Sequence, residues 1–227
     1  MDRRGSDGAD VAVVVIGAGG HAAEVCSYVA DLRAAGTSIR LLGCIDDHKP
    51  VGRCGPVDVL GGFSVLEDLL RGRVDRLRCI TAVGDNPTRR RLVARVDALG
   101  SPHLQWWTLR HPTASVGWDA DIGPGTLLAP FSVVTARVRL GAHCILNVKA
   151  SVSHDSVVGD YVNVNPGAVV AGNVQLGDAA YVGAGATIIE KISIGAGTIV
   201  GAGAAVVRNV PPDVTVVGVP ARVIRSH

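Results

Sequence analysis

The stretch SVSHDSVVGDYVNVNPGAVVAGNV, residues 151–174, carries an aliphatic residue at every sixth position. Extending this step in both directions gives an unbroken aliphatic series from residue 116 to residue 206. Two places before each step the residue is Ala, Ser, Thr, Cys or Val, with Ile192 as the exception. The sixteen step positions are Val116, Ile122, Leu128, Val134, Leu140, Leu146, Val152, Val158, Val164, Val170, Leu176, Val182, Ile188, Ile194, Val200 and Val206.

This period of six predicts a chain that coils as a three-sided prism. Three short strands form one coil of about 18 residues, and each strand points one aliphatic side chain inward. The sequence therefore predicts a parallel β-helix of about five coils, from about residue 112 to residue 207, with all sixteen step residues buried. A β-sandwich would need alternation with period two and irregular loops, which this segment lacks. Glycines 18 residues apart are expected at one corner, where glycine gives the backbone freedom to turn; they are Gly123, Gly141, Gly159, Gly177 and Gly195.

The first hundred residues follow a different pattern, in which strand-like and helix-like segments alternate. A buried strand that enters a Gly-rich turn is expected first, and Asn86 and Pro87 are expected to cap and start the last helix. This alternation predicts a small parallel α/β sheet. The expected segments are the strands at 11–16, 39–47 and 74–85 and the helices at 21–36 and 86–100.

Composition and charge exclude several classes of protein. The net charge of +2 does not suggest a nucleic-acid or membrane-surface binder. Only 4% of the residues are aromatic, and the five cysteines include no CxxC pair, which favours free thiols in a reducing compartment. The apolar run at 11–16 is too short for a signal sequence or a membrane span. A soluble cytoplasmic protein with a mobile tail at residues 1–10 is expected.

A glycine-rich turn and two aspartates point to a nucleotide in the N-terminal half. Residues 17–22, GAGGHA, fit the G-x-G-x-x-G/A pattern after a strand and before a helix, where backbone N–H groups favour a phosphate. Asp46 and Asp47 end the second strand, where a carboxylate can bind a ribose or a base edge. A full dinucleotide fold needs a second half, so one nucleotide is a better prediction than NAD. The pattern is also compatible with a simple tight turn.

His154 and Asp155 are the candidate catalytic pair. They follow the step residue Val152 by two and three places, which predicts that both lie at an exposed corner of the prism. An isolated histidine at such a corner can be a solvated side chain without a role, and His143 is interpreted in that way. An adjacent carboxylate, however, can fix the imidazole tautomer and raise its basicity. The prism offers only these two histidines between residues 112 and 226, so a three-histidine zinc site is not expected and no metal is predicted.

The combination of motifs resembles one family over nearly all of residues 11–226. The motifs are VVVIGAGGHAAEV, GCIDD, AVGDN, LRHPTASVG, the hexapeptides quoted above and VVGVPARVI. Together they resemble the bacterial acyltransferases that include sialic-acid O-acetyltransferase and the N-acetyltransferases of nucleotide-linked 4-amino sugars. The resemblance implies a Rossmann-like nucleotide-sugar domain at residues 11–108. It also implies a left-handed β-helix domain at residues 109–227 that ends in a C-terminal tail.

The resemblance also implies roles for individual residues. His154 matches the catalytic base of the family and Asp155 the acidic residue that raises its basicity. The positions that hold the nucleotide sugar correspond to Gly19, Gly20, His21, Asp46, Asp47 and Gly84. Those that contact acetyl-CoA correspond to Asn163, Ala184 and Ala202. The sequence departs from some members, which have histidine at position 163 and glycine at position 202. Gly172 is a candidate N–H donor to the developing oxyanion.

The implied reaction is direct acetyl transfer from acetyl-CoA to a sugar amine that loses its proton to His154. O-acetylation of a sialic-acid-like or other sugar is the alternative, and a non-catalytic nucleotide-sensing or scaffold protein is a second one. A homotrimer with active sites between subunits is expected, because the family resemblance implies that CoA binds between neighbouring prisms.

Overall fold

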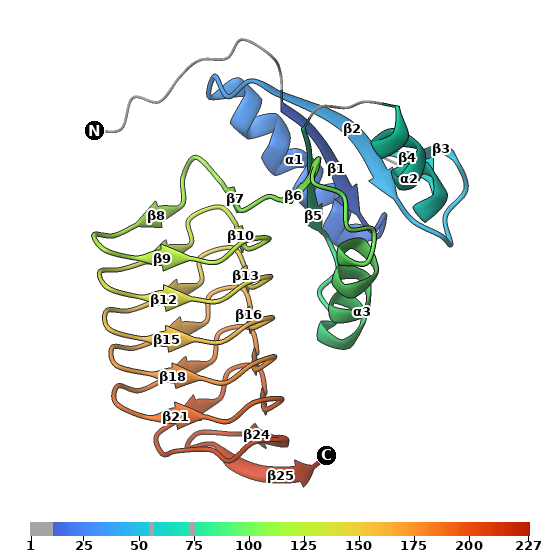
Figure 1. Cartoon of the computed structure of the whole chain (residues 1–227). Coiled ribbons are helices and arrows are strands. Elements are labelled where there is room, and N and C mark those ends of the chain that lie inside the picture. The colour runs from blue at the N-terminus through green and yellow to red at the C-terminus, as the bar shows by residue number, and fades with distance from the viewer. Residues whose placement is uncertain (1–10, 55–56, 73–75) are drawn as a thin grey trace.

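The computed structural model describes residues 11–54, 57–72 and 76–227 and consists of an α/β domain resting on a β-helix (Figure 1). The predicted tail at residues 1–10 lies outside the described residues.

The N-terminal domain is a six-stranded sheet in the order β3-β4-β2-β1-β5-β6. The described pairs are parallel except β3 with β4. One face of the sheet packs against α1 and the β-helix, and the other packs against α2 and α3. Both faces are therefore covered, which explains why the first strand is a continuous apolar run. The elements are β1 (Val11–Ile16), α1 (Gly20–Ala34), β2 (Ile39–Ile45), β3 (Gly52–Cys54), β4 (Val57–Gly61), α2 (Phe63–Arg71), β5 (Leu77–Thr81), α3 (Asn86–Asp97) and β6 (Leu104–Trp106).

The structure confirms the alternation of strands and helices and adds elements that the sequence did not predict. These are β3, β4, α2 and β6; α2 is short and begins after Gly62 without a side-chain cap. The predicted cap of α3 was wrong by one residue. Asp85 caps this helix by accepting a hydrogen bond from the Thr88 N–H at 2.9 Å. Asn86 is instead the first helical residue and donates to the Ala179 carbonyl across the domain boundary at 2.8 Å.

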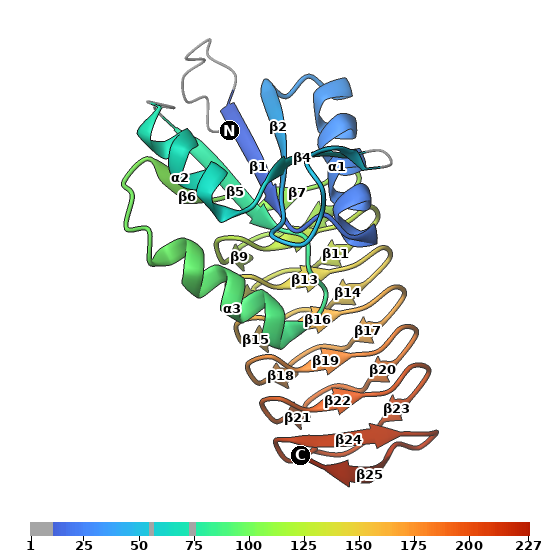
Figure 2. The same cartoon turned by 90° about the vertical axis from the view of Figure 1, so that its right-hand side faces the viewer.

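The β-helix is built from two-residue strands that stack in three parallel sheets. We call these sheets B, C and D. The coil begins at β7, three residues before residue 112, where the six-residue period placed its start. In Figures 1 and 2 the chain passes along sheet D, then B, then C while the coils descend, which makes the helix left-handed. Sheet B contains β7 (Leu109–Arg110), β10 (Leu127–Leu128), β13 (Ile145–Leu146), β16 (Asn163–Val164), β19 (Tyr181–Val182), β22 (Ile199–Val200), β24 (Val214–Val217) and β25 (Arg222–Ser226). Sheet C contains β8 (Ser115–Val116), β11 (Val133–Val134), β14 (Ser151–Val152), β17 (Val169–Val170), β20 (Thr187–Ile188) and β23 (Ala205–Val206). Sheet D contains β9 (Asp121–Ile122), β12 (Arg139–Leu140), β15 (Val157–Val158), β18 (Gln175–Leu176) and β21 (Ser193–Ile194).

The C-terminal residues are ordered rather than a tail. Strand β24 extends sheet B by pairing parallel with β22, and β25 returns antiparallel to it. The bottom of the prism is thus closed by a two-stranded ribbon (Figure 2).

The step residues form the core of the prism, with two exceptions. All are buried except Val116 and Ile122, which are only half-buried. Both lie on strands at the open end of their sheets, β8 and β9, where no preceding coil covers them. The prediction that all sixteen are buried was therefore wrong for the first coil alone.

The glycines spaced by 18 residues have a different role from the one expected. None of them adopts a positive φ; the left-handed conformation falls on other corner residues, such as Asp155 with φ of 61°. The corners of adjacent coils instead pass very close to each other at these glycines. A Cβ on Gly141 would lie 2.6 Å from the backbone carbon of Gly159. Glycine is required there for close approach rather than for turning.

Sheet B carries the N-terminal domain. Its outward-facing Leu109, Leu127 and Ile145 are buried in one cluster with α1 and β1. An outward position on a prism is normally polar, and here it is apolar because a second domain covers it. The docking places α3 alongside sheet B (Figure 2).

His143 is not the solvated corner residue that the sequence suggested. Its side chain lies between the two domains and the residue is only 5% exposed. The ring stacks on Tyr161 at 5.2 Å and meets the edge of Trp106 at 4.6 Å. Because burial disfavours the charged form, the pKa of His143 falls to about 4.

This burial predicts an acid sensitivity of the fold. The ordinary pKa of 6.5 lies above the folded value of about 4, so the neutral form is favoured in the folded state. The stability contributed by neutral His143 is complete above pH 6.5 and is lost as the pH falls towards 4, by a few kcal/mol. Urea unfolding at a series of pH values measures this loss, which we expect to be smaller in His143→Gln. The exposed His48→Gln serves as the control. If the free energy of unfolding falls with pH in His143→Gln as steeply as in the wild type, buried His143 is not the cause of the acid sensitivity.

Candidate active site

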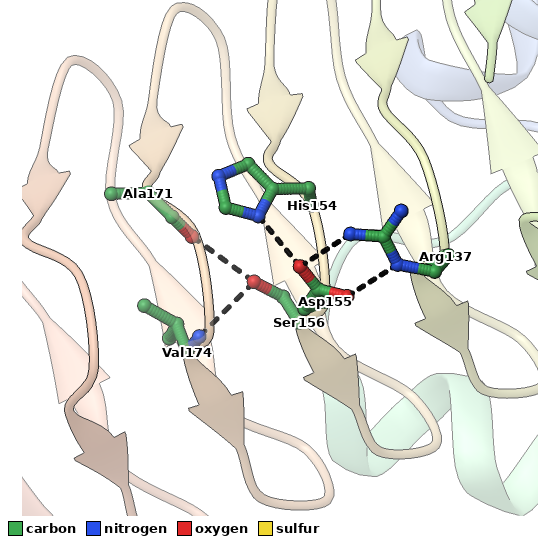
Figure 3. A network of polar contacts seen from close by, with 6 residues as sticks. All are labelled: Arg137, His154, Asp155, Ser156, Ala171 and Val174. Atoms are coloured by element: carbon green, nitrogen blue, oxygen red, sulfur yellow. Dashed lines mark hydrogen bonds and ion pairs between the residues drawn. The ribbon is translucent and has the colours of Figure 1, made fainter. Parts of the chain in front are cut away.

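The turn between β14 and β15 presents the candidate catalytic pair at the edge between sheets C and D, the C–D edge (Figure 3). The His154 side chain is 56% exposed and that of Asp155 is 31% exposed. The next residue, Ser156, points inward and holds the turn in place. Its hydroxyl donates to the Ala171 carbonyl at 3.0 Å and accepts from the Val174 N–H at 3.1 Å. The structure thus places the pair at an exposed corner, as the six-residue period predicted.

Asp155 orients the imidazole of His154. Its Oδ2 lies 2.7 Å from Nδ1 of His154. An ionised carboxylate only accepts hydrogen bonds, so the neutral imidazole carries its proton on Nδ1 and leaves the Nε2 lone pair free. The adjacent Arg137 and then His154 itself hold the pKa of the Asp155 carboxyl low, at about 2. Asp155 is therefore ionised throughout the neutral range.

Arg137 binds the candidate pair, a contact that the sequence analysis did not predict. It occupies the same corner one coil earlier and binds Asp155 through two hydrogen bonds, from Nε to Oδ1 at 2.7 Å and from Nη2 to Oδ2 at 2.9 Å. The available signal was the repeat length, since Arg137 precedes Asp155 by 18 residues and must stack on it. Figure 3 shows Arg137, Asp155 and His154 as a continuous polar network.

Gly172 lies one coil beyond His154 and is covered by its ring. A Cβ at this position would lie 2.7 Å from both Cε1 and Nε2 of the imidazole. Any side chain at position 172 would therefore displace the histidine. Within the described part of the chain, the Gly172 N–H donates to no protein acceptor.

The glycine-rich turn at the start of α1 is open to ligand. Gly19 and Gly20 are exposed, and a Cβ on either would meet nothing within 4 Å. The backbone N–H groups at this helix start are therefore accessible to an anion. His21 follows, and its Nδ1 lies 2.9 Å from the Glu24 carboxylate while its Nε2 is buried without a hydrogen-bond partner among the described residues.

Asp46 and Asp47 lie beside this turn and hold the backbone around it. Asp46 accepts from the Ala18 N–H at 2.8 Å and from the His48 N–H at 2.9 Å. Asp47 accepts from the Phe63 N–H at 3.0 Å and forms an ion pair with Arg95. Both aspartates line a cleft of about 300 Å³ at the carboxyl edge of the sheet. Gly84 lines a second cleft, of about 530 Å³, between the start of α3 and sheet B.

Asn163, which is predicted to contact acetyl-CoA, lies between the two domains. The residue is 2% exposed and both of its amide atoms are already bonded. Its Nδ2 donates to the Gly84 carbonyl at 2.6 Å, and its Oδ1 accepts from Arg89 at 2.7 Å. Asn163 is buried because it is an outward residue of sheet B, the face that the N-terminal domain covers.

Arg89 is the centre of this interdomain contact. Arg89 is fully buried, and its guanidinium donates to four backbone carbonyls and to the side-chain amide oxygens of Asn86 and Asn163, none of them a carboxylate. From the N-terminal domain it binds the Val83 and Gly84 carbonyls, and from the prism it binds the His143 and Tyr161 carbonyls. Burial lowers the pKa of Arg89 to about 10, so the group stays charged at neutral pH.

The remaining predicted residues lie on another edge of the prism. Ala184 and Ala202 are exposed at the turns between sheets B and C, and we call this the B–C edge. Within one chain, His154, Asp155 and Gly172 therefore come together, whereas the two alanines and the glycine-rich turn lie elsewhere. The C–D edge is opposite sheet B, the face that carries the N-terminal domain.

Two features are absent from the part of the chain that the structure describes. No group of three His, Cys, Asp or Glu side chains is arranged to hold a metal ion. None of the helices that the structure describes combines the length and the apolar character needed to cross a bilayer.

Both parts of the chain match known protein families. The family described as "PglD N-terminal domain" matches residues 12–96, and "Bacterial transferase hexapeptide (six repeats)" matches residues 155–190. The chain is 38% identical over 61 residues to GDP-perosamine N-acetyltransferase of Escherichia coli O157:H7, a match that covers 27% of this chain and 28% of that relative.

Two solved structures match over almost the whole chain. The acetyltransferase domain of PglB from Neisseria gonorrhoeae FA1090, in complex with acetyl coenzyme A, is 32% identical, with a TM-score of 0.84 over 95% of this chain and 100% of that one. A histidine-to-asparagine mutant of perosamine N-acetyltransferase from Caulobacter crescentus, in complex with CoA and GDP-perosamine, is also 32% identical. Its TM-score is 0.84 over 95% of this chain and 97% of that one. The chain therefore belongs to the family of bacterial hexapeptide-repeat sugar acetyltransferases that carry a PglD-type N-terminal domain.

Proposed function

We propose that this protein transfers the acetyl group of acetyl-CoA to the amino group of a nucleotide-linked amino sugar of the 4-amino-4,6-dideoxy type. The observation that carries the proposal is the contact between Asp155 and Nδ1 of His154, which leaves Nε2 of His154 free to accept a proton. Full-length similarity to structures that hold acetyl coenzyme A, or CoA with GDP-perosamine, supports it. The four described cysteines are free thiols, as suits a cytoplasmic protein that uses these metabolites.

In the proposed mechanism the sugar amine attacks the thioester carbon directly. Nε2 of His154 takes the proton that the nitrogen loses as the new C–N bond forms. The carbonyl oxygen becomes an oxyanion, for which the Gly172 N–H is the proposed donor. The C–S bond then breaks, and CoA leaves as a thiolate that is protonated to the thiol. Asp155 balances the charge of the imidazolium that forms in between.

A covalent acyl-enzyme is not part of this mechanism. Cys144 is the nearest cysteine to His154 along the chain, and it lies in the interior of the prism. Its thiol donates to the Gly159 carbonyl at 3.1 Å, and burial raises the pKa of Cys144 to about 12. A thiol in that state is a poor nucleophile.

The proposed site is completed by a second copy of the chain. His154 lies on the edge opposite the face that carries the glycine-rich turn, so a sugar bound at that turn does not reach the histidine of its own chain. In a homotrimer of parallel prisms, the C–D edge of one chain meets the B–C edge of the next. That arrangement places His154 and Gly172 of one subunit against Ala184 and Ala202 of its neighbour, with acetyl-CoA between them.

Two inactive variants test whether the site lies between chains. His154→Ala removes the base, and Gly20→Asp adds a carboxylate that repels a phosphate at the helix start. Because a Cβ at Gly20 meets nothing within 4 Å, this second change preserves the fold. Each variant alone is expected to be inactive.

Co-expression of the two variants is expected to restore about a quarter of the wild-type activity. In random assembly, about a quarter of the interfaces combine an intact His154 from one chain with an intact Gly20 from its neighbour. Light scattering measures the assembly in parallel, with a mass of three chains expected. Mixed assemblies without activity would contradict a site shared between subunits.

A further inference from the structure

Arg137 is an exposed residue on the C–D edge, and its side chain is directed at the catalytic carboxylate. Its guanidinium binds both oxygens of Asp155, and Oδ2 of Asp155 is shared with Nδ1 of His154. Such a bidentate contact between planar groups fixes the rotation of the carboxylate as well as its position. Without it, Asp155 would be free to turn away from the imidazole.

The Arg137–Asp155 pair contributes little to the stability of the fold. The arginine side chain is 49% exposed, and ion pairs in that setting are largely screened by water and salt. Its effect on the molecule therefore falls on the two groups that it orders, Asp155 and, through it, His154.

The charges around His154 show what the arginine adds. Asp155 is adjacent, Arg137 lies one coil before it, and Asp119 one further coil before, while Glu190 and Lys191 lie two coils after it on the same edge. Coils are spaced by about 4.8 Å, so Arg137 is the nearest cation and Asp155 the nearest anion. A carboxylate alone beside the imidazole would favour the protonated form, which is unable to act as a base. The arginine offsets that charge.

We propose that Arg137 is a positioning residue for acetyl transfer: it fixes the Asp155 carboxylate against Nδ1 of His154 and offsets its negative charge, so that Nε2 stays free to accept a proton near neutral pH. This inference rests on the proposed role of His154 as the base. Arg137 thus has two roles, one in orienting the Asp155 carboxylate and one in compensating its charge, and different substitutions separate them.

Arg137→Gln and Arg137→Lys distinguish the two parts in the pH profile of kcat. Gln removes the cation beside the Asp155 carboxylate, so the acid limb of the profile is expected to move to higher pH and the plateau to fall several-fold. Lys keeps the positive charge but does not form the bidentate contact with Asp155. The acid limb of the profile is therefore expected to stay near its wild-type position while the plateau value of kcat falls. High salt screens the charge of Arg137, so it is expected to bring the acid limbs of Arg137→Gln and of the wild type closer together.

Arg139→Gln is the matched control, because Arg139 forms an exposed ion pair with Asp121 on sheet D at 3.6 Å. Its pH profile and melting temperature, and the melting temperature of Arg137→Gln, are expected to equal those of the wild type. An Arg137→Gln profile that superimposes on the wild type would overturn the inference while leaving His154 as the base. A His154→Ala enzyme with normal turnover would instead overturn the proposed function on which it rests.

Discussion

Replacement of His154 with alanine is expected to lower kcat by roughly 10²–10⁴, the usual contribution of a positioned general base. The KM values for acetyl-CoA and for the sugar nucleotide should change little, because the imidazole acts on a proton that moves only during the reaction. The melting temperature should also stay the same, since the side chain is 56% exposed and packs against little besides Gly172. Steady-state kinetics with each substrate varied in turn measure the three parameters.

Two further variants locate the effect at the base. Asp155→Asn should lower kcat less than His154→Ala, because the imidazole remains and loses only its orientation and the balancing charge. The acid limb of the pH profile, present in the wild type, should disappear in His154→Ala. The exposed His103→Ala, in the loop between α3 and β6, is the control and should leave kcat unchanged. If His154→Ala turned over at close to the normal rate, solvent would be removing the proton and the pair would have no catalytic role.

Replacement of Arg89 with methionine is expected to lower the free energy of unfolding by about 3–5 kcal/mol. Methionine fills much of the space of the arginine stem but donates no hydrogen bond. The His143 and Tyr161 carbonyls of the prism and the Gly84 carbonyl of the first domain would each lose a buried donor. Urea unfolding at a fixed chain concentration measures the change.

The neighbouring Arg91 supplies the control for this experiment. Arg91 is exposed on the same helix and donates to the Thr88 hydroxyl at 2.9 Å. Arg91→Met is therefore expected to change the free energy of unfolding by less than about 1 kcal/mol. Equal effects of the two substitutions would show that the buried arginine does not hold the domains together.

The fold could be predicted from the sequence because its period is strict. A six-residue step that never lands on a polar side chain leaves one arrangement for the chain, and the core residues followed directly from it. The role of the spaced glycines did not follow. Whether glycine at a corner serves a turn or a close approach depends on the distance between adjacent coils, as at Gly141 and Gly159, and that distance is not contained in a linear pattern.

The candidate site could be predicted in part, for the same kind of reason. His154 and Asp155 follow a step residue by two and three places, so the period alone placed them at an exposed corner. The period marks Asn163 and His143 as outward as well, yet both are buried. Their burial results from the docking of the N-terminal domain on sheet B, an interaction between segments some 70 residues apart, such as Arg89 and Asn163. A repeat describes the prism and gives no information about what covers it.

The product of the reaction tests the central claim most directly. The protein would be incubated with acetyl-CoA and, separately, with GDP-, UDP- and dTDP-linked 4-amino sugars and their 4-hydroxy counterparts, and the sugar nucleotides would be analysed by mass spectrometry. We predict that one amino-sugar nucleotide gains the mass of a single acetyl group, with release of one equivalent of free CoA thiol. NMR should place the new acetyl group on the sugar nitrogen, and His154→Ala should form the product far more slowly. Acetylation of the hydroxy sugars alone, or no transfer to any member of the panel, would contradict the account.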